Sequence, residues 1–149
     1  MTRKHREMSL EEVGRSLHGN AIHLLRDVRT EDSAMGIGPA QASALSMVVF
    51  NGPISLNALA EAEQVRPPTM SRVVEALVKG GLVRREVNRD DRRSVIISST
   101  DRGKRVIHEG RSRREKRLIK LLSQLDRDEI TCLGEASGIL SRILVSEHA

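Results

Sequence analysis

A chain of 149 residues, 38% hydrophobic and 30% charged, is long enough for one domain with a sizeable core. No window approaches the roughly 18 apolar residues of a membrane span, and no apolar signal core follows the basic N-terminus, so we expect a cytoplasmic protein. The single cysteine, Cys132, excludes an intrachain disulfide and a cysteine-based zinc cluster.

The basic charge is concentrated in one segment. Residues 66–120 contain 17 Lys and Arg against 7 Asp and Glu, a net charge of +10 in a chain whose total is +5. Such a segment indicates a polyanionic partner, although a solvated basic helix face would look the same. With no Trp, no Tyr and one Phe, the chain has few rings on which single-stranded bases could stack, which favours duplex DNA.

Capping signals and helical periodicity predict the elements of the N-terminal half. Ser9-Leu10-Glu11-Glu12 has the spacing of a capping box and opens a helix over residues 10–29. A loop over 30–38 precedes a second helix that begins at Pro39 and continues to Phe50. Ser55 caps a short third helix, residues 56–63.

A fourth helix follows the sequence Val65-Arg66-Pro67-Pro68 and ends at Gly80-Gly81. One side of it carries a stripe that we expect to face the core: Met70, Val73, Val74, Leu77 and Val78. The opposite side carries Thr69, Arg72 and Lys79, so this helix presents a polar face outward.

The C-terminal half begins with two strands, 82–87 and 95–98, joined by a charged turn. Thr100 then caps a long basic helix over about 101–124. A second capping-box spacing, Asp126-Arg127-Asp128-Glu129, opens the last helix. The first and last helices carry apolar stripes without an obvious partner, so we expect them to pack on each other or on another copy.

Two short helices followed by a strand pair predict a winged helix-turn-helix. The fold class expected is mostly α with a small β-ribbon: a winged helix-turn-helix part (39–100) flanked by helical dimerisation parts (9–30 and 101–146) in one domain, 1–149. In this arrangement a helix fits the DNA major groove and the ribbon places an arginine in the minor groove.

Ordered motifs along the chain carry a more specific signal. The sequence resembles the MarR (multiple-antibiotic-resistance regulator) family of bacterial transcription factors over about residues 10 to 145. The motifs that match are, in order, Gly38-Pro39-Ala40-Gln41, Asn51-Gly52-Pro53-Ile54-Ser55, Thr69-Met70-Ser71-Arg72-Val73-Val74, Gly81-Leu82-Val83-Arg84-Arg85, Asp91-Arg92-Arg93 and Thr100-Asp101-Arg102-Gly103.

The resemblance implies a homodimer that binds a pseudo-palindromic operator in double-stranded DNA. By matching position, the DNA-binding residues would be Arg66, Pro68, Thr69, Ser71 and Arg72 of the recognition helix and Asp91, Arg92 and Arg93 of the wing. Arg93 would enter the minor groove with Asp91 orienting it, and Arg92 would meet a phosphate. The pair Pro67-Pro68 departs from the family, where polar residues are more usual.

The resemblance also implies a repressor relieved by a small aromatic or lipophilic effector. The sequence contains no catalytic constellation. Asp90-Asp91 is a pair of carboxylates, but the arginines around it keep both ionised. The histidines show no metal-ligand spacing. We therefore expect neither an enzyme nor a bound cofactor or metal.

Several alternatives stay open at this point. A winged-helix protein–protein module and a nonspecific duplex binder are the other functions considered. The basic residues Arg113 and Arg114 serve either phosphate contact or solubility. Cys132 is expected to be a small core or interface residue rather than a redox centre.

Overall fold

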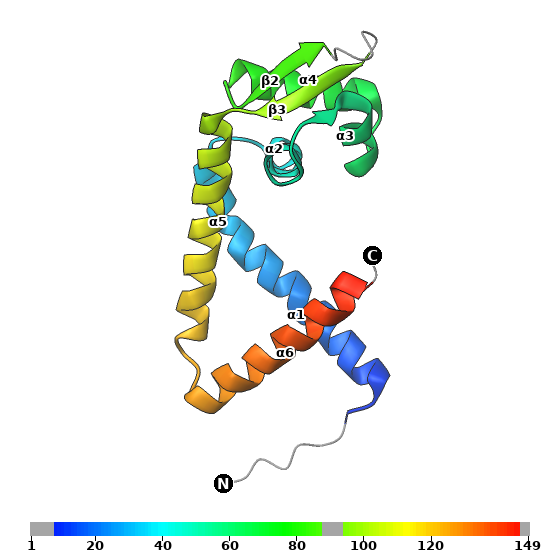
Figure 1. Cartoon of the computed structure of the whole chain (residues 1–149). Coiled ribbons are helices and arrows are strands. Elements are labelled where there is room, and N and C mark those ends of the chain that lie inside the picture. The colour runs from blue at the N-terminus through cyan, green and yellow to red at the C-terminus, as the bar shows by residue number, and fades with distance from the viewer. Residues whose placement is uncertain (1–7, 88–93, 147–149) are drawn as a thin grey trace. The chain divides into compact units, whose positions relative to one another are not determined.

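The computed structural model describes residues 8–87 and 94–146 of the chain. The elements are α1 (Leu10–Arg29), the 3-10 helix η1 (Thr30–Met35), α2 (Pro39–Asn51), β1 (Ile54–Ser55), α3 (Leu56–Ala62), α4 (Pro67–Lys79), β2 (Val83–Val87), β3 (Val95–Ser99), α5 (Asp101–Leu122) and α6 (Arg127–Ser146) (Figure 1). They fall into two compact units, residues 1–114 and 115–149. The fold is mostly α with a small antiparallel sheet, as expected.

Local side-chain hydrogen bonds fix where the first and last helices begin. The Ser9 hydroxyl accepts from the Glu12 amide at 3.2 Å, while the Glu12 carboxylate accepts from the Ser9 amide at 3.0 Å. Asp126 and Glu129 exchange the same two bonds, at 2.8 and 3.1 Å. These bonds confirm both capping boxes predicted from the sequence. Each box satisfies backbone donors that a helix start leaves without a partner in the helix.

The sheet has three strands rather than the predicted two, in the order β1-β3-β2, and all neighbours are antiparallel. Ile54 pairs with Ile97 and Ser55 with Ile96, so the short β1 adds to the edge of β3. On the other edge β2 and β3 pair from Val83 opposite Ser99 to Val87 opposite Val95. A strand of two residues is too short to show an alternating sequence pattern. Its pairing with β3, which is distant in the sequence, is what identifies it as a strand.

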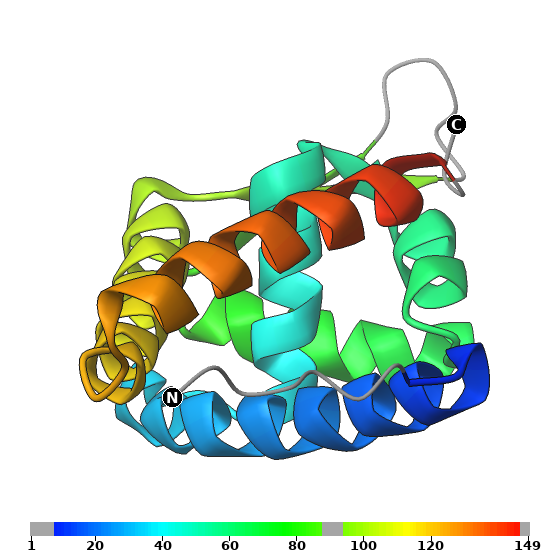
Figure 2. The ribbon, with the colours of Figure 1, turned by 90° about the horizontal axis from the view of Figure 1, so that it is seen from below.

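The core of the first unit lies between α2, α3, α4, the sheet and the start of α5. Its buried side chains are Met35, Ala44, Leu45, Val48, Leu59, Ala60, Met70, Val74, Leu77, Leu82, Val83, Ile97 and Ile107. Figure 2 shows α2 at the centre of this unit, between α3 and the first turns of α5. The prediction that Val78 faces the core is wrong: it is 39% exposed, at the edge of the α4 stripe.

The prediction of a loop over residues 30–38 is also wrong in part, because residues 30–35 form the 3-10 helix η1. Met35 at its end is buried beside α5, where a β-carbon on Gly110 would lie 2.8 Å from the Met35 sulfur. Asp32 of η1 accepts a hydrogen bond from Arg114 of α5 at 2.6 Å. These contacts stabilise a short helix that the polar sequence alone does not predict.

The first and last helices, α1 and α6, bury little of their apolar surface. No residue of α1 is buried, and none is buried among residues 127–144 of α6. Their exposed large hydrophobic side chains are Leu10, Val13, Leu17, Ile22, Leu24, Leu25, Ile130, Leu133, Ile139, Ile143 and Leu144. Cys132 is exposed as well, so the expectation of a core position is wrong and its place in an interface stays a prediction.

Candidate nucleic-acid interface

A tight turn joins α3 to α4. The Gln64 amide donates to the Glu61 carbonyl at 3.0 Å and the Val65 amide donates to Ala60 at 2.9 Å, the two bonds of a Schellman ending. Gln64 has a φ of 54°, in the left-handed region that such an ending requires. Arg66 then adopts an extended backbone, and the chain enters α4 in a new direction.

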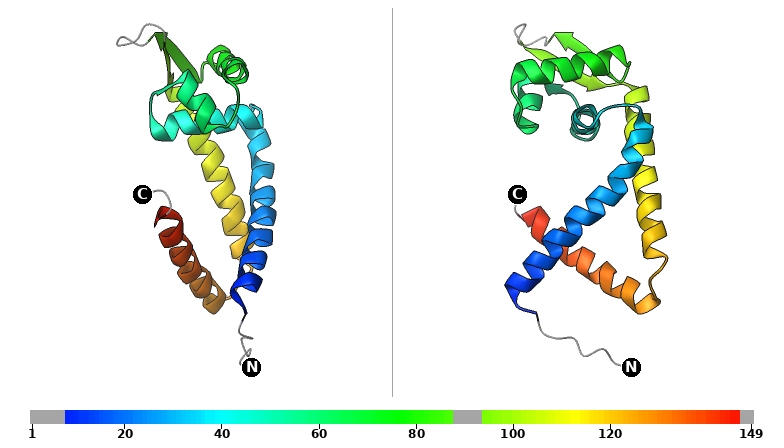
Figure 3. Two further views of the ribbon diagram at one scale, coloured as in Figure 1. Left: turned by 90° about the vertical axis from the view of Figure 1, so that its right-hand side faces the viewer. Right: turned by 180° about the vertical axis from the view of Figure 1, so that it is seen from behind.

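Helix α4 is fixed on one side and open on the other. Met70, Val74 and Leu77 are buried in the core, as their spacing predicted. Seen from behind, α4 lies beside the sheet with its whole length in view (Figure 3). Among the residues predicted to bind DNA, Arg66, Pro68, Thr69 and Arg72 are exposed and Ser71 is half-buried. The fold thus brings these five side chains together at one end of a single helix.

The first turn of α4 has few backbone donors to offer. Pro67 and Pro68 have no amide hydrogen. The next two amides, of Thr69 and Met70, both donate to the Arg66 carbonyl, at 2.9 and 3.1 Å. Helix starts often bind phosphates through free amides, and the first turn of α4 has few of them.

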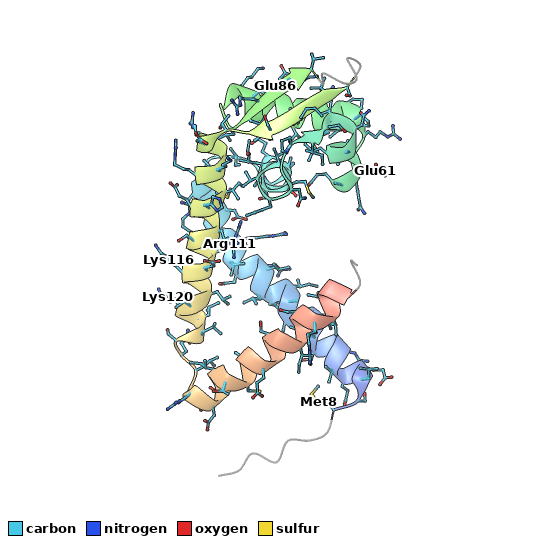
Figure 4. The ribbon with its side chains drawn as sticks, viewed as in Figure 1. Met8, Glu61, Glu86, Arg111, Lys116 and Lys120 are labelled. Carbon is cyan, nitrogen blue, oxygen red and sulfur yellow. The ribbon has the colours of Figure 1, made fainter. Side chains whose placement is uncertain are left out.

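The wing is formed by β2 and β3. Arg84, Arg85, Glu86 and Val87 are all exposed on β2, whereas Ile97 in the middle of β3 is buried (Figure 4 labels Glu86). The motif Gly81-Leu82-Val83-Arg84-Arg85 contributed to the family resemblance, but Arg84 and Arg85 were not predicted to bind DNA. Asp91, Arg92 and Arg93 lie outside the described residues, so their roles at the wing stay predictions.

Thr100 joins the base of the wing to α5. Its hydroxyl donates to the Gly81 carbonyl at 2.7 Å and lies 3.1 Å from the Leu82 carbonyl. The same oxygen accepts from the Gly103 amide at 3.0 Å, which confirms Thr100 as the cap of α5. The Thr-x-x-Gly motif is therefore a structural joint that holds the wing in place.

Comparison with known proteins identifies this architecture. The MarR family profile matches residues 37–95. An HTH-type transcriptional regulator from Mycobacterium leprae is 30% identical over 123 residues, which cover 83% of this chain and 86% of the relative. The chain belongs to the MarR family. It is a DNA-binding transcription regulator, and not an enzyme, because that is what members of this family are.

Other matches agree with this assignment. The transcriptional repressor MdtR from Bacillus subtilis is 28% identical over 95 residues, 64% of this chain and 61% of that relative. The crystal structure of the transcriptional regulator Tm0710 from Thermotoga maritima superimposes with a TM-score of 0.77 at 26% identity, covering 91% and 98% of the two chains. The fold is also that of NadR solved in complex with 4-hydroxyphenylacetate, with a TM-score of 0.61 at 21% identity, covering 96% and 99%.

A cavity of about 740 Å³ opens in the first unit of this MarR-family chain. It lies where α1, η1, α2 and α5 meet. Its lining residues are Arg29, Asp32, Ser33, Ile37, Pro39, Ala42, Ser43, Ser46 and Arg114. The four α2 residues among them share one face of that helix, opposite the buried Ala44, Leu45 and Val48. The cavity therefore combines small apolar groups, hydroxyls and two guanidinium groups.

Basic side chains line α5 and differ in their exposure. Arg111, Lys116 and Lys120 are exposed along the helix (Figure 4). Arg114 is paired with Asp32, and Arg113 lies 4.0 Å from Glu109. Arg114 thus has an intramolecular partner that neither sequence hypothesis, phosphate contact or solubility, foresaw.

The described residues include neither a metal-binding cluster nor a membrane-spanning helix. Within residues 8–87 and 94–146, no three His, Cys, Asp or Glu side chains come close enough together to hold a metal ion. No single helix in that part of the chain is long and apolar enough to cross a membrane.

Proposed function

We propose that this regulator is a homodimeric repressor that binds a pseudo-palindromic DNA operator and is released by a small-molecule effector. The observation that carries the proposal is the outer face of α4, where Thr69 and Arg72 stand exposed on a helix whose other side is anchored in the core. A helix held this way fits the major groove, where its side chains reach base edges.

The wing completes the proposed contact. The β2–β3 pair leads directly into the segment that contains Asp91, Arg92 and Arg93. In our proposal Arg93 enters the minor groove, Asp91 orients it and Arg92 meets a phosphate, since arginine suits the narrow, negative groove of A·T-rich DNA. Arg66 and Ser71 flank the base-reading residues and contact the DNA backbone.

A second copy of the chain is proposed to cover the apolar faces of α1 and α6. Leu17 of α1 is 43% exposed and Leu133 of α6 is 47% exposed, and similar values hold along both helices. Burying such stripes between two copies releases water from apolar surface. We propose that residues 9–30 and 101–146 form this dimerisation part and residues 39–100 the DNA-binding part. A twofold dimer matches half-sites about 10 bp apart.

The cavity beside α2 is the proposed effector site. Its lining, with small apolar groups and two arginines, suits a small aromatic or lipophilic molecule with a polar end. NadR with bound 4-hydroxyphenylacetate and the repressor name of MdtR support this regulatory scheme by analogy. An effector acts by binding one arrangement of the two α4 helices more tightly than another.

The test is a binding titration at about 150 mM salt, a condition at which specific and nonspecific binding separate clearly. The duplex upstream of the protein's own coding region is compared with a scrambled duplex of equal length. A preference of about a thousandfold supports the proposal. Equal weak binding to both, followed by failure to select any preferred duplex from a random library, would indicate a nonspecific binder. No binding even at low salt would leave a protein–protein module.

A further inference from the structure

The two prolines at the start of α4 form an exposed apolar surface on a helix that otherwise faces outward with polar groups. Pro67 and Pro68 are both exposed. Pro68 precedes Arg72 by four residues, so the two share one face of the helix. That face is opposite the buried Met70, Val74 and Leu77. Pro68 therefore stands on the part of α4 that points directly away from the core.

The first turn of α4, residues 67–70, offers no free backbone amide to the polar edge of a base. Neither proline has an amide hydrogen, and the amides of Thr69 and Met70 are used by the Arg66 carbonyl at 2.9 and 3.1 Å. What the turn presents is the hydrocarbon of two pyrrolidine rings. Their fixed φ also means that this surface is already ordered before DNA binds.

We propose that Pro68, with Pro67 beside it, reads the C5-methyl group of thymine in the major groove. This inference rests on the proposed function, in which α4 enters that groove. Thymine alone presents a methyl group there, whereas the other bases present polar edges. Contact between a pyrrolidine ring and the methyl group removes apolar surface from water, which favours binding. Contact with the polar edge of another base would remove bound water without forming a hydrogen bond in its place. Thymine is selected by both effects.

Arg72 sets the neighbouring position. One turn further along the same face, its guanidinium has the two-pronged geometry that fits O6 and N7 of guanine. Glu75 follows Arg72 by three residues on the same side of the helix. Its carboxylate lies 3.3 Å from the Lys79 ammonium, so these two charges pair with each other. The half-site expected for α4 therefore places thymine under Pro68 and guanine under Arg72.

The experiment begins with the full chain and a duplex selected by it from a random library. Each thymine is then replaced by deoxyuridine, which removes the methyl and changes no hydrogen-bonding group. We expect one or two positions per half-site at which affinity falls about three- to fourfold, the value of one buried methyl-sized group. At the other positions the replacement leaves the affinity unchanged.

The variant Pro68→Ser tests which residue is responsible. The thymine-to-uracil affinity ratio at the sensitive position is expected to fall to about one, because a hydroxymethyl group replaces the ring. Pro53→Ser, at an exposed proline in the turn before β1, is the matched control and keeps the wild-type ratio. Each ratio is measured within one variant, so a general loss of affinity or stability does not affect it.

The outcomes separate this inference from the proposed function. A selected duplex that binds equally well when every thymine is replaced by deoxyuridine overturns the reading of thymine but leaves sequence-specific binding intact. A sensitive position whose ratio survives in Pro68→Ser and in the double variant Pro67→Ser/Pro68→Ser overturns the assignment to the prolines. Failure to select any preferred duplex overturns the proposed function together with the inference.

Discussion

Gly103 at the start of α5 packs against the backbone of Leu82 at the base of the wing. A β-carbon at position 103 would lie 2.1 Å from the Leu82 carbonyl oxygen and 3.2 Å from Cδ1 of Leu45. The oxygen belongs to the backbone and accepts a hydrogen bond from the Thr100 amide at 3.0 Å, and the Thr100 hydroxyl lies 3.1 Å from it. It cannot move aside without breaking the joint, so only glycine fits.

The substitution Gly103→Ala is expected to destabilise the protein by about 3 kcal/mol, the upper end of the usual range for overpacking. Urea denaturation followed by circular dichroism measures the effect. Ser112→Ala, at an exposed position of the same helix, is the control and should change stability by less than about 0.5 kcal/mol. Similar midpoints for the two variants would contradict the close packing at Gly103.

Thr100→Val tests the hydroxyl of the same joint. Valine keeps the shape but loses the bond to the Gly81 carbonyl and the cap on the Gly103 amide, so we expect a loss of about 1–2 kcal/mol. Thr100→Ser retains the hydroxyl and should recover most of that loss. Destabilisation by serine but not by valine would assign the effect to the methyl group instead.

Arg72 and Arg84 are expected to differ in the kind of DNA contact they make. Arg72→Ala should cost about 1–3 kcal/mol of binding and relax the preference at one base pair. Arg84→Ala, on the exposed face of β2, should weaken binding to all duplexes and make the log–log salt dependence shallower by about one unit. Titrations on matched and mutated operators at several salt concentrations distinguish the two, with the exposed Arg127→Ala of α6 as the unaffected control.

Arg93→Ala addresses the wing. If Arg93 occupies the minor groove, the variant binds its operator more weakly and no longer prefers A·T pairs in the flank, because the narrow groove is no longer read. The measurement is a competition between operators with A·T and G·C flanks. A variant that keeps the wild-type flank preference would remove Arg93 from the proposed role.

The double variant Leu17→Glu/Leu24→Glu tests the proposed dimer. The two leucines are 43% and 44% exposed and share the apolar stripe of α1, so two carboxylates there would oppose burial against a second copy. Sedimentation of this variant should show monomers. Its operator affinity should be lower than that of the wild type, because the dimer is lost. Arg15→Glu lies on the opposite side of α1 and should remain dimeric. Monomeric wild-type protein at micromolar concentration would contradict the proposal.

Much of the fold follows from local signals in the sequence. The capping boxes at Ser9 and Asp126, the glycine stop after Lys79 and the stripe around Val74 each depend on residues within one or two turns of a helix. The positions predicted to bind DNA through α4 lie together because they follow one another along a single helix. Such features need no knowledge of distant contacts.

The features that were missed depend on residues far apart in the sequence. Strand β1 exists only because Ile54 meets Ile97, and η1 is held by the pairing of Asp32 with Arg114, 82 residues away. The clash that makes Gly103 necessary likewise involves Leu82. Spacing patterns report which face of an element is apolar, but they do not report which partner will meet it.

Helix α1 has a further consequence for the protein in the cell. None of its residues is buried within its own chain, and in proteins most of the stability of a helix comes from packing of its apolar face rather than from helix propensity. In the proposed dimer much of the free energy that holds α1 together comes from association, so the melting temperature is expected to rise with protein concentration by mass action. A regulator built in this way loses structure as it becomes scarce, so its abundance and its resistance to proteolysis rise and fall together.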